Sequence, residues 1–330
     1  MKDDVPLVSY RVSRTAALVH ATRPFVNIHR PGSLPNVFVA SLPRSGSTWL
    51  MELIWSQPGF KPCDEPTDLR NPYVRKHLGI TEWGQLYSDD AGERLFHYFD
   101  RLCNGQLGFL NPRPFRRYYR PATSRIVFKV IHGCEGRLNW LRDTFDGRIV
   151  YLVRHPVAVS LSREVLPTLP AMLDGPYRSH FTREQLEFAA DIVRSGSKLE
   201  RGVLSWCLQT SVPLHDATDD WVIASYEQLI LDPATVVRHL AAKLELPNPQ
   251  RMLDAIATPS QSSRKSDSAT RKLLNADAPT RAQRLVEKWR DQVSDADERR
   301  AMEILDCFDI DFYRAGDPLP DRRYWLTDTD

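Results

Sequence analysis

The chain has 330 residues, of which 42% are hydrophobic and 26% charged, with a formal net charge of +2. These are the proportions of an ordinary globular protein, and they exclude a disordered or fibrous chain. The small net charge argues against a protein that coats polyanions such as nucleic acid. Because α/β domains of about 250 residues or more are often single units, we expect one domain over residues 36–330. Residues 1–35 are expected to form an N-terminal extension that packs on it.

The cysteines and the apolar stretches indicate the compartment. Five cysteines lie far apart, without CxxC or Cys/His spacing, which favours free thiols in a reducing compartment and no metal site. The apolar stretch 16–19 is too short for a signal peptide, and no window approaches the roughly 18 apolar residues of a membrane span. We expect a cytoplasmic protein without a transmembrane segment, and a homodimer is an option that the sequence leaves open.

Short, almost continuously apolar runs predict strands that are covered on both faces, as in a parallel sheet. These runs are Val37–Ala40, Ile126–Ile131, Ile149–Val153 and Trp221–Ser225. Helical patterns follow at Thr48–Ser56, at Pro156–Glu164 and after the N-cap pair Asp232-Pro233. The alternation predicts an α/β fold with a mostly parallel, doubly wound sheet. Residues 259–277 lack a period and suggest a mobile loop, and Arg281–Phe308 returns to helical patterning.

The turn between the first predicted strand and its helix, residues 43–48, has the composition of an anion site. Backbone N–H groups and the positive end of the helix dipole converge at such a helix N-terminus. Gly46 permits close approach of the backbone, while Ser45, Ser47 and Thr48 add hydroxyl groups. In a Walker A alignment Ser47 takes the place of the lysine, and Arg44 supplies a cation instead. The turn therefore suits a smaller phosphate-like anion better than a magnesium-chelated triphosphate.

The octet Pro43–Leu50 resembles the 5′-phosphosulfate loop of sulfotransferases that use 3′-phosphoadenosine 5′-phosphosulfate (PAPS). Those loops often read P-[KR]-S-G-[ST]-[ST]-[WY]-[LV], and every position matches. The resemblance implies a P-loop-like sulfotransferase architecture, PAPS as donor and 3′-phosphoadenosine 5′-phosphate (PAP) as product, without a required metal. The alternative is a plain strand–turn–helix with polar surface residues.

A second segment resembles the motif that holds the 3′-phosphate in this family. Arg154 follows the strand 149–153, and Ser162 lies eight positions later, on the expected helix face that turns back toward it. The resemblance implies Arg154 and Ser162 as 3′-phosphate ligands, although a lone strand-end arginine is also an ordinary feature. His155 stands where the family usually has an acidic or amide side chain, and its role is open.

Further segments extend the resemblance over most of residues 36–315. Tyr226 is expected near the adenine, and Trp49 is expected to stack on it, with core packing as the alternative for Trp49. Arg264 and Lys265 lie in a stretch that resembles a basic loop closing over the 3′-phosphate, or equally a solvated loop.

The chemistry requires a base for the acceptor's proton and positive charge at the leaving phosphate. Arg44 and the loop supply that charge. Lys129 and His132 end the strand 126–131 and resemble the Lys-Thr-His of cytosolic members, with one residue more between them. His132 is the first choice as base because its ordinary pKa lies near neutrality, and Glu65, before a proline, is the second.

The acceptor, bearing a hydroxyl or an amine on a small molecule, lipid or glycan, is not identified by the sequence. The arginine- and aromatic-rich segment 113–120 could face an acidic acceptor, but we favour a solvated face or a cover for the sheet. Two other classes remain: a P-loop-type nucleotide kinase, which the missing lysine disfavours, and a non-catalytic binder of anionic glycans.

Overall fold

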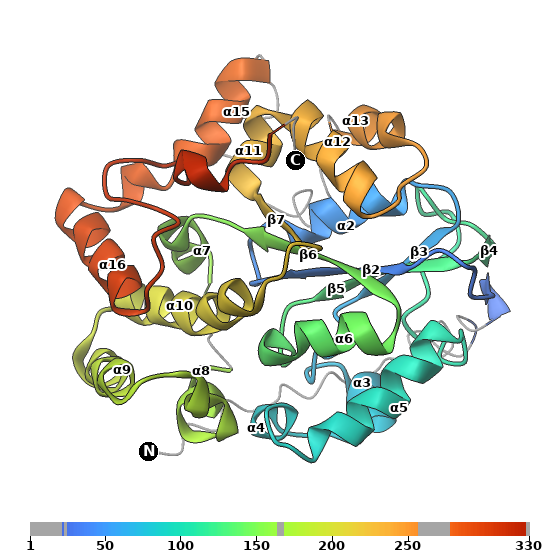
Figure 1. The fold of residues 1–330 in the computed structure, drawn as a ribbon, viewed down its shortest axis with the longest axis horizontal. Coiled ribbons are helices and arrows are strands. Elements are labelled where there is room, and N and C mark those ends of the chain that lie inside the picture. The colour runs from blue at the N-terminus through green and yellow to red at the C-terminus, as the bar shows by residue number, and fades with distance from the viewer. Residues whose placement is uncertain (1–21, 23–24, 164–167, 257–277, 328–330) are drawn as a thin grey trace.

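A computed structural model describes residues 22, 25–163, 168–256 and 278–327 of the chain. The main sheet has five strands in the order β3-β5-β2-β6-β7, and each neighbouring pair is parallel (Figure 1). The strands are β2 (Asn36–Ser41), β3 (Phe60–Asp64), β5 (Arg125–Val130), β6 (Gly147–Val153) and β7 (Val222–Ser225). A separate two-stranded parallel pair joins β1 (Ile28–His29) to β4 (Ala122–Thr123). The predicted α/β class and parallel sheet are confirmed.

Helices cover both faces of the sheet, as Figure 1 shows, with α2, α11 and α12 on one face and α6 and α10 on the other. The helices between β2 and β6 are α2 (Ser47–Trp55), α3 (Pro72–Leu78), α4 (Trp83–Leu86), α5 (Ala91–Cys103), η2 (Glu135–Arg137) and α6 (Leu138–Thr144). Those between β6 and β7 are α7 (Pro156–Leu161), α8 (Leu169–Asp174), η3 (Pro176–His180), α9 (Arg183–Ser195) and α10 (Lys198–Asp216). After β7 come α11 (Tyr226–Leu231), α12 (Pro233–Lys243), α13 (Pro249–Ile256), α15 (Ala278–Glu287), η5 (Arg290–Gln292), α16 (Asp295–Cys307) and η6 (Arg322–Tyr324).

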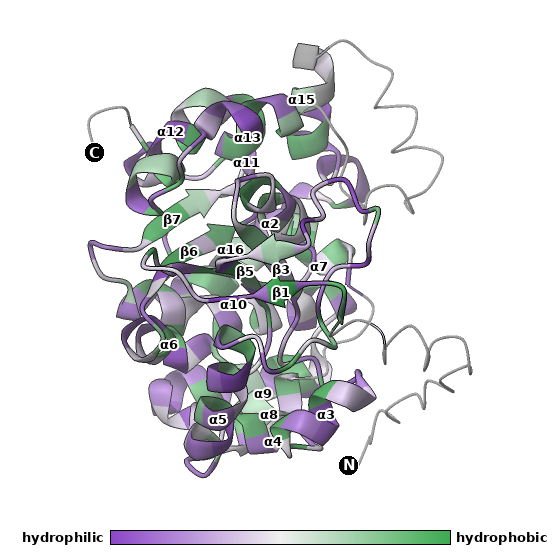
Figure 2. Ribbon diagram, turned by 90° about the vertical axis from the view of Figure 1, so that its right-hand side faces the viewer, coloured by the Kyte–Doolittle hydropathy of each residue, from purple (hydrophilic) through white to green (hydrophobic). Residues whose placement is uncertain are grey.

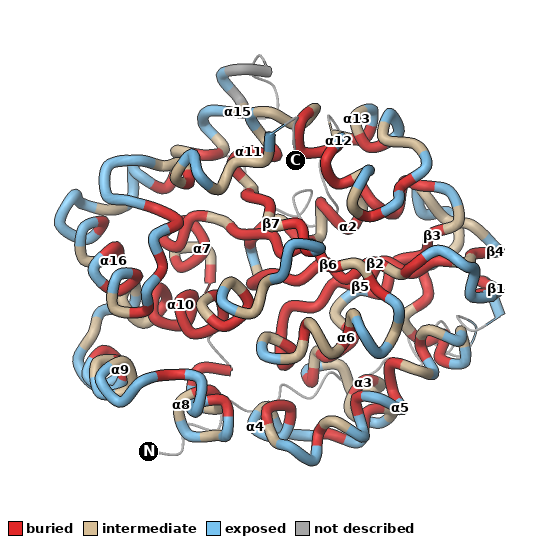
Figure 3. The backbone as a smooth tube through the Cα atoms, in the orientation of Figure 1, coloured by how far each residue is buried: buried red, intermediate tan, exposed pale blue. Residues whose placement is uncertain are grey.

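The alternation of side chains along each strand divides the core into two layers. On β2, Val37 and Val39 pack with the apolar face of α2, whereas Phe38 and Ala40 join the larger cluster on the α10 side. The strands are buried along almost their whole length (Figure 3), and apolar residues concentrate on them, whereas the outer helices carry both hydrophilic and hydrophobic residues (Figure 2). Because both faces are covered, the strands read as continuous apolar runs in the sequence.

The four predicted strands are confirmed with ends shifted by one or two residues, but β3 was not predicted. Its sequence, Phe-Lys-Pro-Cys-Asp, carries a lysine and a proline. Proline is tolerated there because β3 is an edge strand, whose outward N–H groups need no partner in the ladder. The Asp232 cap is confirmed, since its carboxylate accepts from the Thr235 N–H. The predicted helical stretch 281–308 corresponds to α15 and α16 with a short break between them.

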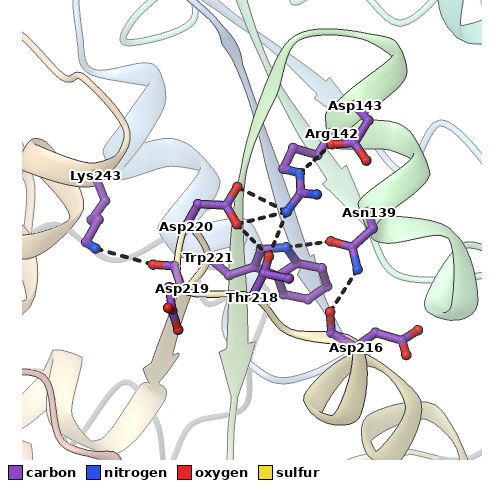
Figure 4. A network of polar contacts seen from close by, with 9 residues as sticks. All are labelled: Asn139, Arg142, Asp143, Asp216, Thr218, Asp219, Asp220, Trp221 and Lys243. Carbon is purple, nitrogen blue, oxygen red and sulfur yellow. Dashed lines mark hydrogen bonds and ion pairs between the residues drawn. The ribbon is translucent and has the colours of Figure 1, made fainter.

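A polar network holds the start of β7 against α6 (Figure 4). The Trp221 indole N–H donates to Asn139, which in turn donates to the carbonyl of Asp216 at the end of α10. Arg142 pairs with Asp220 at 2.8 Å and also donates to Thr218. These contacts fix the amino end of β7, at the edge of the sheet opposite to the predicted anion loop.

Three further findings concern the compartment and the domain limits. All five cysteines are free thiols, as expected. In the described part of the chain, no helix combines the length and the apolar character that crossing a bilayer requires. The expected extension over residues 1–35 lies mostly outside the described residues, and the loop expected at 259–277 lies wholly outside them.

Candidate active site

The loop between β2 and α2 adopts the left-handed backbone that an anion cradle requires. Arg44 has φ 74° and Gly46 has φ 96°, so the chain turns sharply just before α2. The Trp49 N–H donates to the Gly46 carbonyl, whereas helix geometry leaves the N–H groups of Ser47 and Thr48 without an acceptor inside the helix. Ser45 is 0% exposed, yet its hydroxyl has no hydrogen-bond partner. An orphaned hydroxyl beside free helix N–H groups fits a phosphate or sulfate oxygen.

The strand end of β6 lies directly beside this loop. Nη1 of Arg154 donates to the carbonyl oxygen of Arg44 at 2.8 Å, and its guanidinium lies 4.3 Å from the centre of the Tyr226 ring. The same ring covers Gly46 and meets Trp49 edge-on at 6.3 Å. Residues from three strand ends, 44–49, 154 and 226, therefore lie together at one edge of the sheet. The second predicted cation is turned toward the first loop.

The backbone around Arg154 is clamped from both sides. The indole N–H of Trp206 donates to the Arg154 carbonyl at 3.0 Å, and the His155 N–H donates to the Glu227 carboxylate at 3.0 Å. The second oxygen of Glu227 accepts from the Tyr313 hydroxyl at 2.9 Å. Burial raises the pKa of Glu227. The hydrogen bonds from the His155 N–H and the Tyr313 hydroxyl offset part of this rise, because they stabilise the ionised carboxylate.

His155, whose role the sequence left open, is a core residue. Its ring is fully buried and stacks on Trp289 with centroids 4.1 Å apart. Burial, followed by repulsion from Arg154 and Arg290, lowers the pKa of His155 to about 3, so the ring is neutral. It supports the strand end by packing.

Ser162 lies one residue beyond α7, whereas the sequence suggested a helix continuing to residue 164. Its hydroxyl donates to the Val159 carbonyl at 2.8 Å, as a C-cap residue. The expected helix to residue 164 was therefore too long, because α7 ends at Leu161. No hydrogen bond joins Ser162 to Arg154 within the described residues.

Lys129 links the loop to two carboxylates. It follows Val127 on the α2 side of β5, and its ammonium donates to the Thr48 hydroxyl at 2.9 Å. The same ammonium pairs with Asp64 at 2.6 Å and with Glu65 at 2.9 Å. Burial alone would lower the pKa of Lys129, but attraction to the two carboxylates outweighs it and the pKa is raised. Burial raises the pKa of Glu65. A charged triad thus touches the first turn of α2.

His132 lies on the other side of the sheet from Lys129. β5 ends at Val130, and the His132 side chain lines a small cavity with Ala40, Tyr151 and Gln209 on the α10 side. Its ring contacts Trp83 edge-on at 5.1 Å, and its Nδ1 has no partner. Burial, with repulsion from Arg163, Arg70 and Lys129, holds the pKa of His132 well below its usual value. No hydrogen bond joins His132 to residues 43–48 in the described structure.

Two predicted segments remain, the arginine- and aromatic-rich stretch 113–120 and the basic loop with Arg264 and Lys265. In the segment 113–120, Arg120 donates to the carbonyls of Trp55 and Ser56 at the end of α2, and Tyr118 packs edge-on against Trp55. Arg113 and its neighbours up to 117 are largely exposed. Both parts agree with the favoured interpretation of a cover and a solvated face. Arg264 and Lys265 lie outside the described residues.

Sequence reasoning missed the groups that hold the site in place. Asp64 ends the unpredicted strand β3, while Trp206, Glu227 and Tyr313 are each distant in sequence from Arg154. Glu227 alone carried a signal, since it directly follows Tyr226 in the sequence. The other partners become visible only when the helices pack.

The five-stranded parallel sheet, with a glycine turn, Arg154 and Tyr226 together at the carboxyl ends of its strands, defines a doubly wound α/β protein. A family model described as "Sulfotransferase family" matches residues 35–250, and the chain belongs to this family. No curated protein matches the chain in sequence.

Several solved sulfotransferase structures are similar to the chain, at low identity. The sulfotransferase domain of the Synechococcus olefin synthase is 16% identical, with a TM-score of 0.44, over 86% of this chain and 97% of that one. A mouse sulfotransferase in complex with PAP is 16% identical, with a TM-score of 0.44 and 87% of each chain covered. A sulfotransferase of Mycobacterium avium is 14% identical, with a TM-score of 0.37, over 85% of this chain and 78% of that one. The family assignment rests on the sequence match and not on these similarities.

Proposed function

We propose that the protein transfers a sulfuryl group from PAPS to a hydroxyl or amine of an acceptor. The observation that carries this proposal is the approach of Arg154 to the 43–48 loop, where its guanidinium meets the Arg44 carbonyl and the Tyr226 ring. Two arginines, Arg44 and Arg154, at the carboxyl ends of neighbouring strands suit a nucleotide with phosphates at both ends of its ribose. The family match supports sulfuryl transfer in general.

The residues of the loop would hold the 5′ end of the donor. Arg44, the hydroxyls of Ser45, Ser47 and Thr48 and the free N–H groups of the first turn, including Gly46, are the donors available there. Arg154 and Ser162 would bind the 3′-phosphate, and Trp49 and Tyr226 would lie beside the adenine. Arg264 and Lys265 remain a prediction for the closing loop.

In this reaction the sulfur–oxygen bond between the sulfuryl group and the 5′-phosphate of PAPS breaks, and PAP is the leaving group. Lys129 and Thr48 would stabilise the charge that develops on that phosphate, because their hydrogen bond holds the ammonium against the loop. The acceptor's hydroxyl or amine also requires a base that takes its proton. The sequence ranked His132 before Glu65. We propose the reverse order, because Glu65 reaches the loop through Lys129 at 2.9 Å, whereas His132 has no such connection.

Calorimetric titration with PAP, with and without EDTA, tests the donor site. We expect metal-independent binding, and Arg154→Ala should remove charge-assisted hydrogen bonds worth about 3 kcal/mol, or more than a hundredfold in Kd. Arg148→Ala is the matched control, because Arg148 lies at the other end of β6 and pairs on the surface with Glu245. Equal affinity of the two variants would contradict the assignment of Arg154.

The reaction is tested by transfer of labelled sulfate from PAPS to alcohols, phenols, amines, lipids and glycans. Sulfated product from any member supports the proposal and identifies the acceptor. Preference for ATP with Mg²⁺ over PAP would instead indicate a kinase. Salt-sensitive binding of anionic glycans without affinity for nucleotides would indicate a binding protein.

A further inference from the structure

Two segments of the chain, 25–34 and 113–120, expose apolar side chains to water. Among the described residues, seven large hydrophobic side chains are exposed, and four of them lie in these two segments. The four are Phe25 (85% exposed), Ile28 (60%), Leu34 (46%) and Phe115 (102%). A single exposed apolar residue is ordinary, but several in neighbouring segments indicate an interaction surface.

The two segments lie side by side at the end of the molecule where β1 pairs with β4, on the right in Figure 1. The Ile28 N–H donates to the Pro121 carbonyl at 2.7 Å, and the Tyr119 hydroxyl donates to the Val26 carbonyl. We call residues 25–34 and 113–120 together the β1 patch. Because hydrogen bonds join the two segments, their exposed side chains form one surface.

Phe115 is exposed at the tip of a turn. The Arg116 N–H donates to the Arg113 carbonyl at 3.4 Å, which places Phe115 third in the turn, with φ 66°. Glycine and asparagine are preferred at such a position, and a bulky residue there is unusual. An exposure of 102% leaves the ring no packing against the chain. Neither the local backbone nor the core favours a phenylalanine here, so its favourable contacts must come from outside the chain.

The β1 patch is also positively charged. The chain has 42 acidic residues, yet none lies in 25–51 or in 101–134, the stretches that contain the patch. Its exposed cations are Arg30, Arg113, Arg116 and Arg117. Glu52 of α2, of intermediate exposure, acts on Tyr118 but leaves the excess of arginine in place. On a chain with a net charge of only +2, this local excess is complementary to an anionic surface.

The proposed donor site does not account for the β1 patch. β4 directly precedes β5, so the patch lies near the amino ends of the strands, whereas the 43–48 loop follows the carboxyl end of β2. Arg120 and Tyr118 contact the last residues of α2, and the 43–48 loop precedes its first. The arginines and phenylalanines of the patch therefore require another partner.

We propose that the β1 patch docks the protein on the surface of an anionic lipid membrane. Phe25, Ile28 and Phe115 enter the headgroup region, and the exposed arginines face the lipid phosphates. Side chains that stand clear of the protein surface would need matching pockets on a protein partner, whereas a bilayer interface deforms around them. Apolar residues beside a cluster of arginines are the combination that binds such an interface. This inference does not depend on sulfuryl transfer.

Sedimentation of the full chain with lipid vesicles tests the charged part of the patch. The vesicles consist of phosphatidylcholine alone or contain one third phosphatidylglycerol. We expect at least tenfold tighter binding to the anionic vesicles, weakened by salt, and about fivefold loss for each of Arg113→Ser and Arg117→Ser. Arg299→Ser is the matched control, because Arg299 is exposed on α16, at the other end of the molecule in Figure 1.

Phe115→Asn tests the apolar part without a cost in folding. Asparagine accepts the left-handed backbone, so Tm should stay constant or rise. Binding to the anionic vesicles should nevertheless fall about tenfold, because the ring no longer leaves water. Val193→Ser, at an exposed apolar position on α9, should bind like the wild type.

Three outcomes would overturn this inference. The first is equal binding of the wild type to both kinds of vesicle, or binding to neither. The second is loss of binding in the arginine variants but not in Phe115→Asn, which would indicate recognition by charge alone, as by an acidic protein or glycan. The third is self-association of the wild type that Phe115→Asn abolishes in sedimentation velocity, because a second copy would then occupy the patch. All variants should bind PAP normally, and a wild type that fails to bind PAP would contradict the proposed function alone.

Discussion

The contact between Gly46 and the Tyr226 ring makes Gly46→Ala the sharpest probe of the loop. Gly46 has φ 96°, and a Cβ built on it would lie 2.6 Å from Cδ2 and 3.0 Å from Cε2 of Tyr226. The added methyl group is therefore strained by its own backbone and also collides with the ring. Because Arg154 lies on the same ring at 4.3 Å, a displaced Tyr226 also displaces the second cation.

The expected cost is the sum of two effects. A left-handed non-glycine residue costs about 1–2 kcal/mol, and overpacking a buried contact typically costs about 1–3 kcal/mol more. We therefore expect Gly46→Ala to lower the free energy of unfolding by about 2–5 kcal/mol. Gly79 provides the control, since it has φ 72° with nothing within 4 Å of a built Cβ. Gly79→Ala should show the backbone cost alone.

Urea unfolding of both variants measures the difference, and calorimetry with PAP measures its consequence for the site. Gly46→Ala should bind PAP at least tenfold more weakly, whereas Gly79→Ala should bind like the wild type. Replacing the ring by Tyr226→Leu in the Gly46→Ala background should recover part of the packing cost but not the affinity. If Gly46→Ala matches Gly79→Ala in both assays, the Tyr226 contact has no role in shaping the loop.

Three further variants test the groups around the loop. Glu65→Gln should reduce sulfuryl transfer about a hundredfold or more without changing PAP affinity, and a full rate for this variant would eliminate Glu65 as the base. Because burial raises the pKa of Glu65, the activity of the wild type should already fall on acidification at a pH above the ordinary carboxyl range. Glu227→Gln should weaken PAP binding about tenfold by loosening the backbone beside Arg154, and unchanged binding would show that the clamp is dispensable. Lys129→Met should destabilise the protein at neutral pH and less so at acidic pH, because Asp64 and Glu65 lose their shared cation and Glu65 keeps only the longer ion pair with Arg70, at 3.4 Å, until protonation; urea unfolding at several pH values checks the sign.

Much of the fold was predictable because two independent signals agreed. Runs such as 149–153 are apolar enough to be recognised as buried strands, and the glycine turn at 43–48 marks a strand–helix junction. β3 was not predicted because an edge strand has one free side and therefore tolerates lysine and proline, which interrupt the apolar pattern. The end of α7 was not predicted because a serine can either continue a helix or cap it. In the structure Ser162 caps α7, and its hydroxyl donates to the Val159 carbonyl.

The sequence predicted the site residues that lie at strand ends. It did not predict the residues whose role depends on contacts with side chains distant in the sequence. The loop and Arg154 lie at strand ends, so topology brings them together. The choice between Glu65 and His132 depended on the face of the sheet on which each lies, and a shift of one residue at the end of β5 decides that. No spacing rule relates Lys129 to an acid in an unpredicted strand.

The clamp on Arg154 has a practical consequence for anyone who shortens this protein. The family match ends at residue 250, but the hydroxyl that completes the Glu227 carboxylate belongs to Tyr313, and the indole under His155 belongs to Trp289. A fragment cut at the limit of the match would keep Arg44–Trp49, Arg154, Ser162 and Tyr226, but it would lose Arg264 and Lys265 and the support behind Arg154. Expression boundaries should therefore follow the packing of the chain's last third and not the extent of its recognisable sequence.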